Sequence, residues 1–239
     1  LKKHNFDKIF IFNSSFRFSL IAKIAGIKNI YQYPLFKKKN QHIINAAKNF
    51  LKKKINLDVE SNSQILIDEK LINETKIKYK VDDSHLNILL GIGGSGPTKR
   101  IPSKTFINFM KLISKKHDCK FFLATGKDEE EQKILNEILK TDFKEKCFPL
   151  DNLSLKEIMP IIKNCKISIC NDSSFSHLSA ALGIQTIVLM SDTPLLYGSY
   201  SPRMYPIIPD DEKSVTHNTL GKNKINPNKI FEKLNDILN

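Results

Sequence analysis

Residues Lys166–Gly183 read KISICNDSSFSHLSAALG, a strand-like segment followed by a helix-like one. Its apolar run, Ile167–Cys170, has the length and composition of a buried strand. The small polar residues 171–174 follow, and such residues suit a turn and then a helix N-cap. From Phe175 the spacing predicts a helix that ends at Gly183. A strand entering a helix in this way leaves N–H groups and the positive end of the helix dipole pointing outward, which favours phosphate binding.

His177 lies in the first turn of that helix, within reach of the same ligand. The alternative interpretation is an ordinary capped helix after a core strand, with His177 as a surface residue. The remainder of the chain is needed to choose between these two.

Around this stretch, predicted strands and helices alternate. The strands are predicted at 88–92, 121–124, 167–170 and 186–190, and the helices at 103–116, 129–139, 154–162 and 175–182. Strands that alternate with helices of about ten residues predict parallel βαβ units in an open, doubly wound sheet. Ligands on such sheets bind outside the carboxyl ends of the strands. The candidate site is therefore formed by three loops, 93–102, 125–130 and 171–177.

The first part of the chain is less regular. A strand is predicted at 9–12, an apolar helix at 16–25 and an amphipathic helix at 41–54, whereas 55–83 is polar and weakly patterned. We expect a domain boundary near residue 80, which divides the chain into 1–80 and 81–239. Because the chain opens at Leu1 in what resembles the middle of a domain, we also expect the natural N-terminus to be absent.

Composition restricts the classes of function. The 239 residues are 41% hydrophobic and 26% charged, which is typical of a soluble globular protein. The four cysteines form no CxxC pair, so we expect reduced core thiols in a cytoplasmic protein. The formal net charge of +13 suits nucleic acid, an anionic membrane surface or an anionic substrate. Because no basic motif is interleaved with aromatic residues, nucleic acid is the least favoured of these.

Two of the loops have distinctive sequences. GGSGPTKRIP, residues 93–102, combines glycines that permit close backbone approach with the donors Ser95, Thr98 and Lys99. It lacks the spacing of a P-loop, and a flexible connector is the alternative. GKDEEE, which begins at Gly126, places acids at a helix start, where complementing the helix dipole is the simpler interpretation.

In this order, the motifs GxxGPxKRxP, GxxxEE and NDSxxxHLxAALG resemble the ADP-heptose–lipopolysaccharide heptosyltransferase family, glycosyltransferase family nine. The resemblance is strong over about residues 84–200 and weaker over 1–60. It implies the GT-B fold, two Rossmann-like doubly wound domains, here an incomplete acceptor-side domain at 1–80 and a donor-binding domain at 81–239. It also implies inverting transfer of a sugar, heptose from ADP-heptose, onto the lipopolysaccharide inner core, by a cytoplasmic protein peripheral to the inner membrane.

The resemblance also assigns roles to individual residues. Lys99 would contact the donor diphosphate, with Ser95 and the Gly94 backbone in support. The remaining donor-binding positions are Asp172, Ser173 and His177 for the diphosphate and sugar, Glu130 for the ribose and Leu153 for the adenine. The chain departs from the family where Ser174 and Ser191-Asp192-Thr193-Pro194 stand in place of usual glycines.

The chemistry expected of these residues needs no metal or cofactor. A lysine and helix N-terminal N–H groups can stabilise a departing diphosphate, and the sequence has no DxD pair. In the family the general base is an aspartate in the first βα loop of the acceptor domain, and this chain has no counterpart. We therefore expect that base to lie in a missing N-terminal segment. Two alternatives remain: a non-catalytic nucleotide-binding remnant of the same fold, and a basic nucleic-acid-binding protein.

Overall fold

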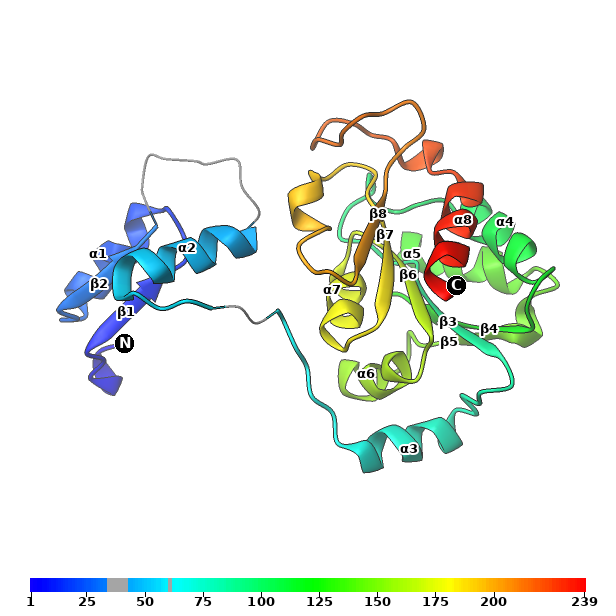
Figure 1. Cartoon of the computed structure of the whole chain (residues 1–239), viewed down its shortest axis with the longest axis horizontal. Helices are drawn as coiled ribbons and strands as arrows, with labels where there is room; N and C mark the ends of the chain where they lie inside the picture. The colour runs from blue at the N-terminus through cyan, green and yellow to red at the C-terminus, as the bar shows by residue number, and fades with distance from the viewer. Residues whose placement is uncertain (34–42, 60–61) are drawn as a thin grey trace. The chain divides into compact units, whose positions relative to one another are not determined.

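The computed structural model describes residues 1–33, 43–59 and 62–239, and the chain forms two compact units, Leu1–Ser61 and Asn62–Asn239 (Figure 1). The division lies earlier than the boundary predicted near residue 80. The reason is the segment before the first strand of the larger unit, which packs on that unit. Ile65 donates its backbone N–H to the Ala181 carbonyl at 2.8 Å. Helix α3 (Glu69–Lys78) packs against α6 (Leu155–Lys163), and the Asn164 amide donates to the Ile72 carbonyl at 3.0 Å.

The smaller unit is built on two parallel strands. After a 3-10 turn at Lys2–His4, it contains β1 (Lys8–Ile11), α1 (Phe16–Ile24), β2 (Asn29–Gln32) and α2 (Ile43–Ile55). Side chains on a strand alternate between its two faces. Accordingly, Ile11 packs with Ala22 of α1, while Phe10 and Phe12 meet Phe50 of α2 at ring-centroid distances of 6.5 and 5.3 Å.

The larger unit contains a parallel sheet of six strands in the order β5-β4-β3-β6-β7-β8. Its strands are β3 (Leu86–Gly91), β4 (Cys119–Ala124), β5 (Cys147–Pro149), β6 (Ile167–Asn171), β7 (Gln185–Leu189) and β8 (Met204–Ile207). From β3 the chain winds outward to β5, then returns to β6 and winds the other way. The switch point therefore lies between β3 and β6, where doubly wound folds bind ligands. The predicted fold class is confirmed.

Helices cover both faces of this sheet (Figure 1). One face carries α4 (Ser103–Ile113), α5 (Glu129–Leu139) and α8 (Pro227–Leu238), and the other carries α3, α6 and α7 (Ser174–Ala181). Both faces are apolar: Ile88 and Leu90 point into the first core and Leu89 into the second. Further 3-10 turns lie at Lys144–Lys146, Leu195–Tyr197 and Lys222–Lys224. A sheet buried on both faces holds the strand ends, and the loops that follow them, in fixed positions.

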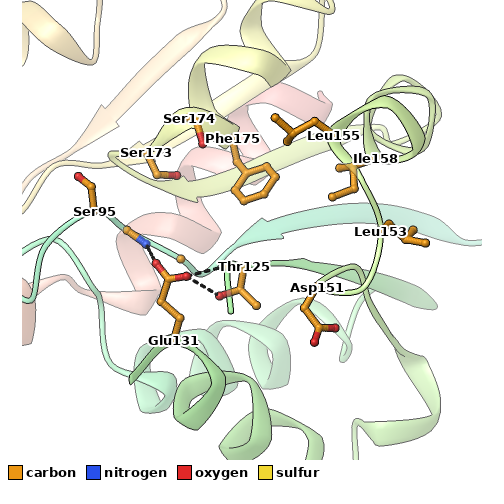
Figure 2. Close-up of a pocket in the computed structure, with 13 residues that line it drawn as sticks. Ser95, Thr125, Glu131, Asp151, Leu153, Leu155, Ile158, Ser173, Ser174 and Phe175 are labelled. Atoms are coloured by element: carbon orange, nitrogen blue, oxygen red, sulfur yellow. Dashed lines mark hydrogen bonds between the residues drawn. The ribbon is translucent and has the colours of Figure 1, made fainter. Parts of the chain in front are cut away.

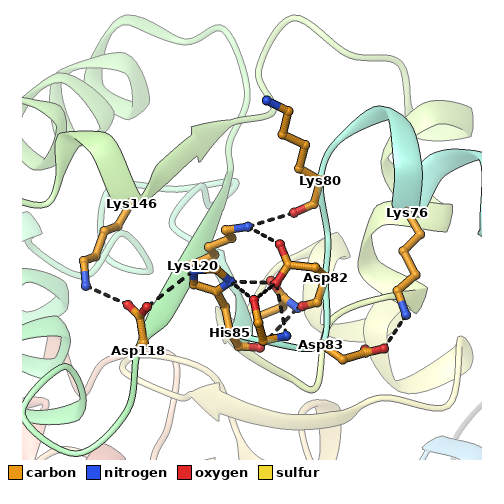
Figure 3. A network of polar contacts seen from close by, with 10 residues as sticks. Lys76, Lys80, Asp82, Asp83, His85, Asp118, Lys120 and Lys146 are labelled. Carbon is orange, nitrogen blue, oxygen red and sulfur yellow. Dashed lines mark hydrogen bonds and ion pairs between the residues drawn. The ribbon is translucent and has the colours of Figure 1, made fainter.

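A polar network closes the amino end of β3 and β4, at the edge of the sheet away from the candidate loops (Figure 3). The His85 ring lies between Asp82, at 2.6 Å from Nδ1, and Asp118, at 3.4 Å from Nε2. Lys120 contacts Asp82 at 2.5 Å and Lys146 contacts Asp118 at 2.9 Å. Hydrogen bonds from the Lys120, Ser84 and His85 side chains hold the pKa of Asp82 well below its usual range. These groups satisfy one another, and we interpret the network as structural.

The two units differ sharply in charge. Residues 1–61 contain 13 basic residues (Lys and Arg) but only three acidic ones (Asp and Glu). Residues 62–239 contain 25 basic and 22 acidic residues. Most of the net charge of +13 therefore belongs to the smaller unit. Among the described residues, no helix is both long and apolar enough to cross a membrane.

Candidate nucleotide-binding site

The loops that follow β3, β4 and β6 line one cavity of about 450 Å³ at the switch point of the larger unit (Figure 2). Neighbouring parallel strands bring these loops together although they are far apart in sequence. The lining consists of Gly93, Gly94, Ser95, Thr125, Gly126, Glu131, Asp151, Leu153, Leu155, Ile158, Ser173, Ser174 and Phe175. All three predicted loops thus contribute to a single site.

Glu131 joins the two glycine-containing loops. Its side chain is buried, and one carboxylate oxygen accepts the Gly94 N–H at 2.7 Å. The other oxygen accepts the Gly126 N–H at 2.7 Å and lies 3.4 Å from the Thr125 hydroxyl (Figure 2). A glycine at 126 suits this contact, because an added Cβ there would collide with a Glu131 oxygen and displace the carboxylate. One carboxylate therefore sets the spacing of two walls of the cavity.

Two further side chains hold the loop that follows β3. The Asn171 amide donates to the Ile92 carbonyl at 2.8 Å, and the Ser191 hydroxyl donates to the Thr98 carbonyl at 2.8 Å. Asn171 ends β6, the strand beside β3, and Ser191 follows β7, the next strand of the sheet, so two strands on the same side of β3 fix the loop. The departure from the family pattern at Ser191 thus has a structural role here.

The cavity has an apolar side and a polar side (Figure 2). Phe175, Leu153, Leu155 and Ile158 gather on one side, whereas Ser95, Ser173 and Glu131 lie on the other. An apolar slot beside a few convergent polar groups is the usual form of a small-molecule site. Its apolar side suits a flat aromatic ring and its polar side suits hydroxyl or phosphate oxygens.

The polar side includes the N-terminus of α7. Ser173 is the N-cap residue, but its hydroxyl makes no capping hydrogen bond. That oxygen is inaccessible to solvent and has no hydrogen-bond partner among the described residues. The feature that favours a ligand here is the helix N-terminus itself, because its free N–H groups and the positive end of the helix dipole suit an anionic oxygen.

Charged groups lie beside the cavity. Lys99 Nζ and a carboxylate oxygen of the buried Asp172 form an ion pair of 2.7 Å. His177, half-buried in the first turn of α7, contacts the Tyr200 hydroxyl through Nδ1 at 2.7 Å. Burial lowers the pKa of His177, with Asp172 acting in the opposite direction and Lys99 in the same direction. The ring is thus mainly neutral at neutral pH.

The structure brings most of the predicted site residues together. Gly94, Ser95, Leu153 and Ser173 line the cavity, and Lys99, Asp172 and His177 form the group beside it. Glu130 is different: it is exposed in the first turn of α5 and does not line the cavity.

The carboxylate that faces the cavity is that of the next residue, Glu131, because the turn of the helix points Glu130 outward. Sequence reasoning missed Glu131, Phe175 and Tyr200. In the run Glu129–Glu131 nothing but the register of the helix distinguishes the buried acid. Across the described residues, no cluster of three or more His, Cys, Asp or Glu could hold a metal ion.

Comparison with known proteins places this geometry in a family. The model of glycosyltransferase family 9 (heptosyltransferase) matches residues 1–234. The chain belongs to this family of glycosyltransferases. Lipopolysaccharide heptosyltransferase 1 of Campylobacter coli is 23% identical over 90% of the chain and 70% of its own length. Lipooligosaccharide heptosyltransferase 2 of Campylobacter jejuni is 27% identical over 78% of the chain but only 58% of its own length.

Solved heptosyltransferase structures share the fold. The E. coli ADP-heptose lipopolysaccharide heptosyltransferase II is 20% identical with a TM-score of 0.72, over 99% of this chain and 78% of that one. An E. coli heptosyltransferase with ADP is 13% identical with a TM-score of 0.70, over 98% of this chain and 73% of that one. The expected resemblance to the family and to its GT-B fold is confirmed.

Proposed function

We propose that the larger unit of this chain is the donor-binding domain of an inverting heptosyltransferase, with ADP-heptose as the donor. The observation that carries the proposal is the cavity at the switch point, which combines an apolar side with the N-terminus of α7. The adenine would occupy the apolar slot near Leu153 and Phe175. The diphosphate would lie against Ser173 and Lys99.

Electrostatics support this placement. A leaving nucleoside diphosphate gains negative charge, and in the proposed pose the Lys99 ammonium and the α7 N–H groups would stabilise that charge. Lys99 is already paired with Asp172, so the incoming phosphate would share or replace an existing carboxylate partner. In support, two solved structures of one E. coli heptosyltransferase with this fold contain ADP and ADP-2-deoxy-2-fluoro heptose, respectively.

The acceptor and location follow from the family. We propose the lipopolysaccharide inner core as acceptor and the cytoplasmic face of the inner membrane as the place of transfer. Among the described residues of the smaller unit, the carboxylates are Asp7 and Asp58, and Asp58 is paired with Lys52 at 3.0 Å. Neither follows a glycine in a βα loop, so we assign neither as the general base.

Calorimetry with ADP, UDP, GDP and CMP tests the nucleotide. ADP should bind most tightly to the wild-type chain, and Lys99→Ala should weaken it, whereas Lys104→Ala, a change at an exposed lysine of α4, should not. Preference for another nucleotide would contradict the adenine assignment. Binding of oligonucleotides without any nucleotide binding would favour the nucleic-acid alternative.

A further inference from the structure

The His177 ring is held by a residue that the proposed function does not use. Tyr200 lies between the 3-10 turn Leu195–Tyr197 and β8, and its hydroxyl oxygen is 2.7 Å from His177 Nδ1. The two rings also stack, with centroids 5.5 Å apart and planes inclined by 17°. A hydrogen bond together with a stacked ring fixes both the position and the rotation of the imidazole.

This contact leaves the other ring nitrogen for a ligand. Within the described part of the chain, the structure shows a hydrogen bond to Nδ1 of His177 and none to Nε2. A neutral imidazole carries one N–H, and the hydrogen bond at one nitrogen decides which tautomer is present. If the Tyr200 hydroxyl donates to Nδ1, the hydrogen of His177 must reside on Nε2.

The surroundings favour a protonated Tyr200 hydroxyl and a neutral His177 ring. Burial raises the pKa of Tyr200, so its O–H is retained, and burial lowers the pKa of His177, so its ring is uncharged near neutral pH. The charged groups that act on the ring are Asp172 and Lys99, which are paired with each other. A second cation beside Lys99 would be repelled, whereas a neutral N–H donor is tolerated.

We infer that Tyr200 is a positioning residue that holds His177 as the Nε2–H tautomer, a neutral donor to an oxygen of the bound nucleotide-sugar. The assignment of the ligand rests on the proposed function, but the assignment of the tautomer does not. In this arrangement Lys99 supplies the charge and His177 supplies a directed hydrogen bond. The aromatic ring of Tyr200 supports the imidazole while its hydroxyl selects the tautomer.

NMR of the ligand-free chain tests the tautomer. Long-range ¹H–¹⁵N spectra of ¹⁵N-histidine-labelled protein at about pH 7.5 should show His177 as Nε2–H, with His177→Gln used to assign its signals. Tyr200→Phe keeps the ring and removes only the hydroxyl, so it should shift His177 toward a mixture of tautomers. Tyr197→Phe, in the same segment, should leave His177 unchanged. An Nδ1–H tautomer in the wild type, or identical His177 spectra in Tyr200→Phe, would overturn the inference.

Calorimetry with ADP-heptose tests the ligand. Tyr200→Phe should lower affinity about two- to tenfold, the range expected for the loss of one directed hydrogen bond. Tyr197→Phe should have no effect, and an unchanged affinity in Tyr200→Phe would contradict the role in donor binding. If the wild-type chain binds no ADP-heptose, the proposed function fails, while the NMR result still decides the role of Tyr200.

Discussion

Replacing Glu131 by Gln, and comparing the variant with Glu130→Gln, tests which of the two carboxylates stabilises the fold and which binds a ligand. The change keeps the shape of the side chain but turns one of the two acceptor oxygens into an NH₂ group. Each oxygen now accepts a backbone N–H at 2.7 Å, from Gly94 or from Gly126. In the variant one of these N–H groups would face another donor and lose its partner.

The expected cost follows from that single lost bond. A hydrogen bond to a charged group contributes about 1.5–3 kcal/mol, and the N–H that loses its acceptor lies in a buried or part-buried position. For a domain of this size, such a loss corresponds to a fall in Tm of roughly 3–12 °C. Thermal and denaturant unfolding of the whole chain, followed by circular dichroism, would measure it.

Glu130→Gln is the matched control, because the same change is made one residue away on an exposed side chain. Its stability should stay within about 0.5 kcal/mol of the wild type. If Glu130 contacts the ribose as the resemblance implies, this variant should instead weaken ADP binding. Equal stability of the two variants would refute the proposal that Glu131 joins the loops, and unchanged ADP affinity in Glu130→Gln would remove Glu130 from the donor site.

Four further outcomes are expected. Lys99→Ala should weaken ADP binding about 10- to 150-fold, because a charge-assisted contact is lost and Asp172 is left unpaired. An unchanged dissociation constant for ADP in calorimetry would remove Lys99 from the site. Gly91→Ala should destabilise the chain by about 1–3 kcal/mol in denaturant unfolding, since the new Cβ would lie 2.6 Å from Cys170 Sγ; wild-type stability would contradict the close packing. The free energy of unfolding should rise with pH between the lowered pKa of His177 and about 6.5, because the unfolded ring binds the proton more tightly, and His177→Gln should flatten that rise. Assays with ADP-heptose and a deacylated inner-core acceptor should give only background transfer; ordinary turnover would show that a carboxylate of this chain serves as the base.

The core elements of the larger unit are predictable because their patterns are strong. The helix predicted at 129–139 is observed as Glu129–Leu139, and the β6 strand differs from its prediction by one residue. In α6, Glu157 accepts from the backbone N–H and the hydroxyl of Ser154, and the Ser-x-x-Glu spacing of such a capping box can be read from the sequence. Parallel strands buried on both faces leave little ambiguity in such a pattern.

The missed elements have weaker or unread signals. The sequence analysis does not predict helix α3, because the exposed Leu71 and Ile77 interrupt the pattern of one apolar face. The N-cap residue Asp68, which accepts the Lys70 N–H at 2.8 Å, could have indicated the start of this helix. Helix α8 was also missed, although Asn226 and Pro227 form a recognisable N-terminus. Short strands such as β5 depend on tertiary pairing and have almost no local signal.

The candidate site is predictable in its loops but not in its contacts. Topology alone places the three loops at one edge of the sheet, and the structure agrees. Which of the three acids 129–131 points inward depends on how α5 is rotated against the sheet. The spacing of residues in the sequence does not predict that rotation to within one residue. The partner of His177 lies more than twenty residues away in an irregular segment, so only the fold reveals Tyr200.

The unequal charge of the two units has a consequence for how each responds to ionic strength. The larger unit is nearly balanced, with 25 basic and 22 acidic residues, so it creates little field beyond the Debye length of about 8 Å at physiological salt. Its own net charge therefore adds little to the long-range attraction of a nucleotide. The smaller unit, with 13 basic against three acidic residues, attracts anions more strongly. Added salt should therefore weaken the encounters of the smaller unit with anionic surfaces much more than those of the larger unit taken by itself.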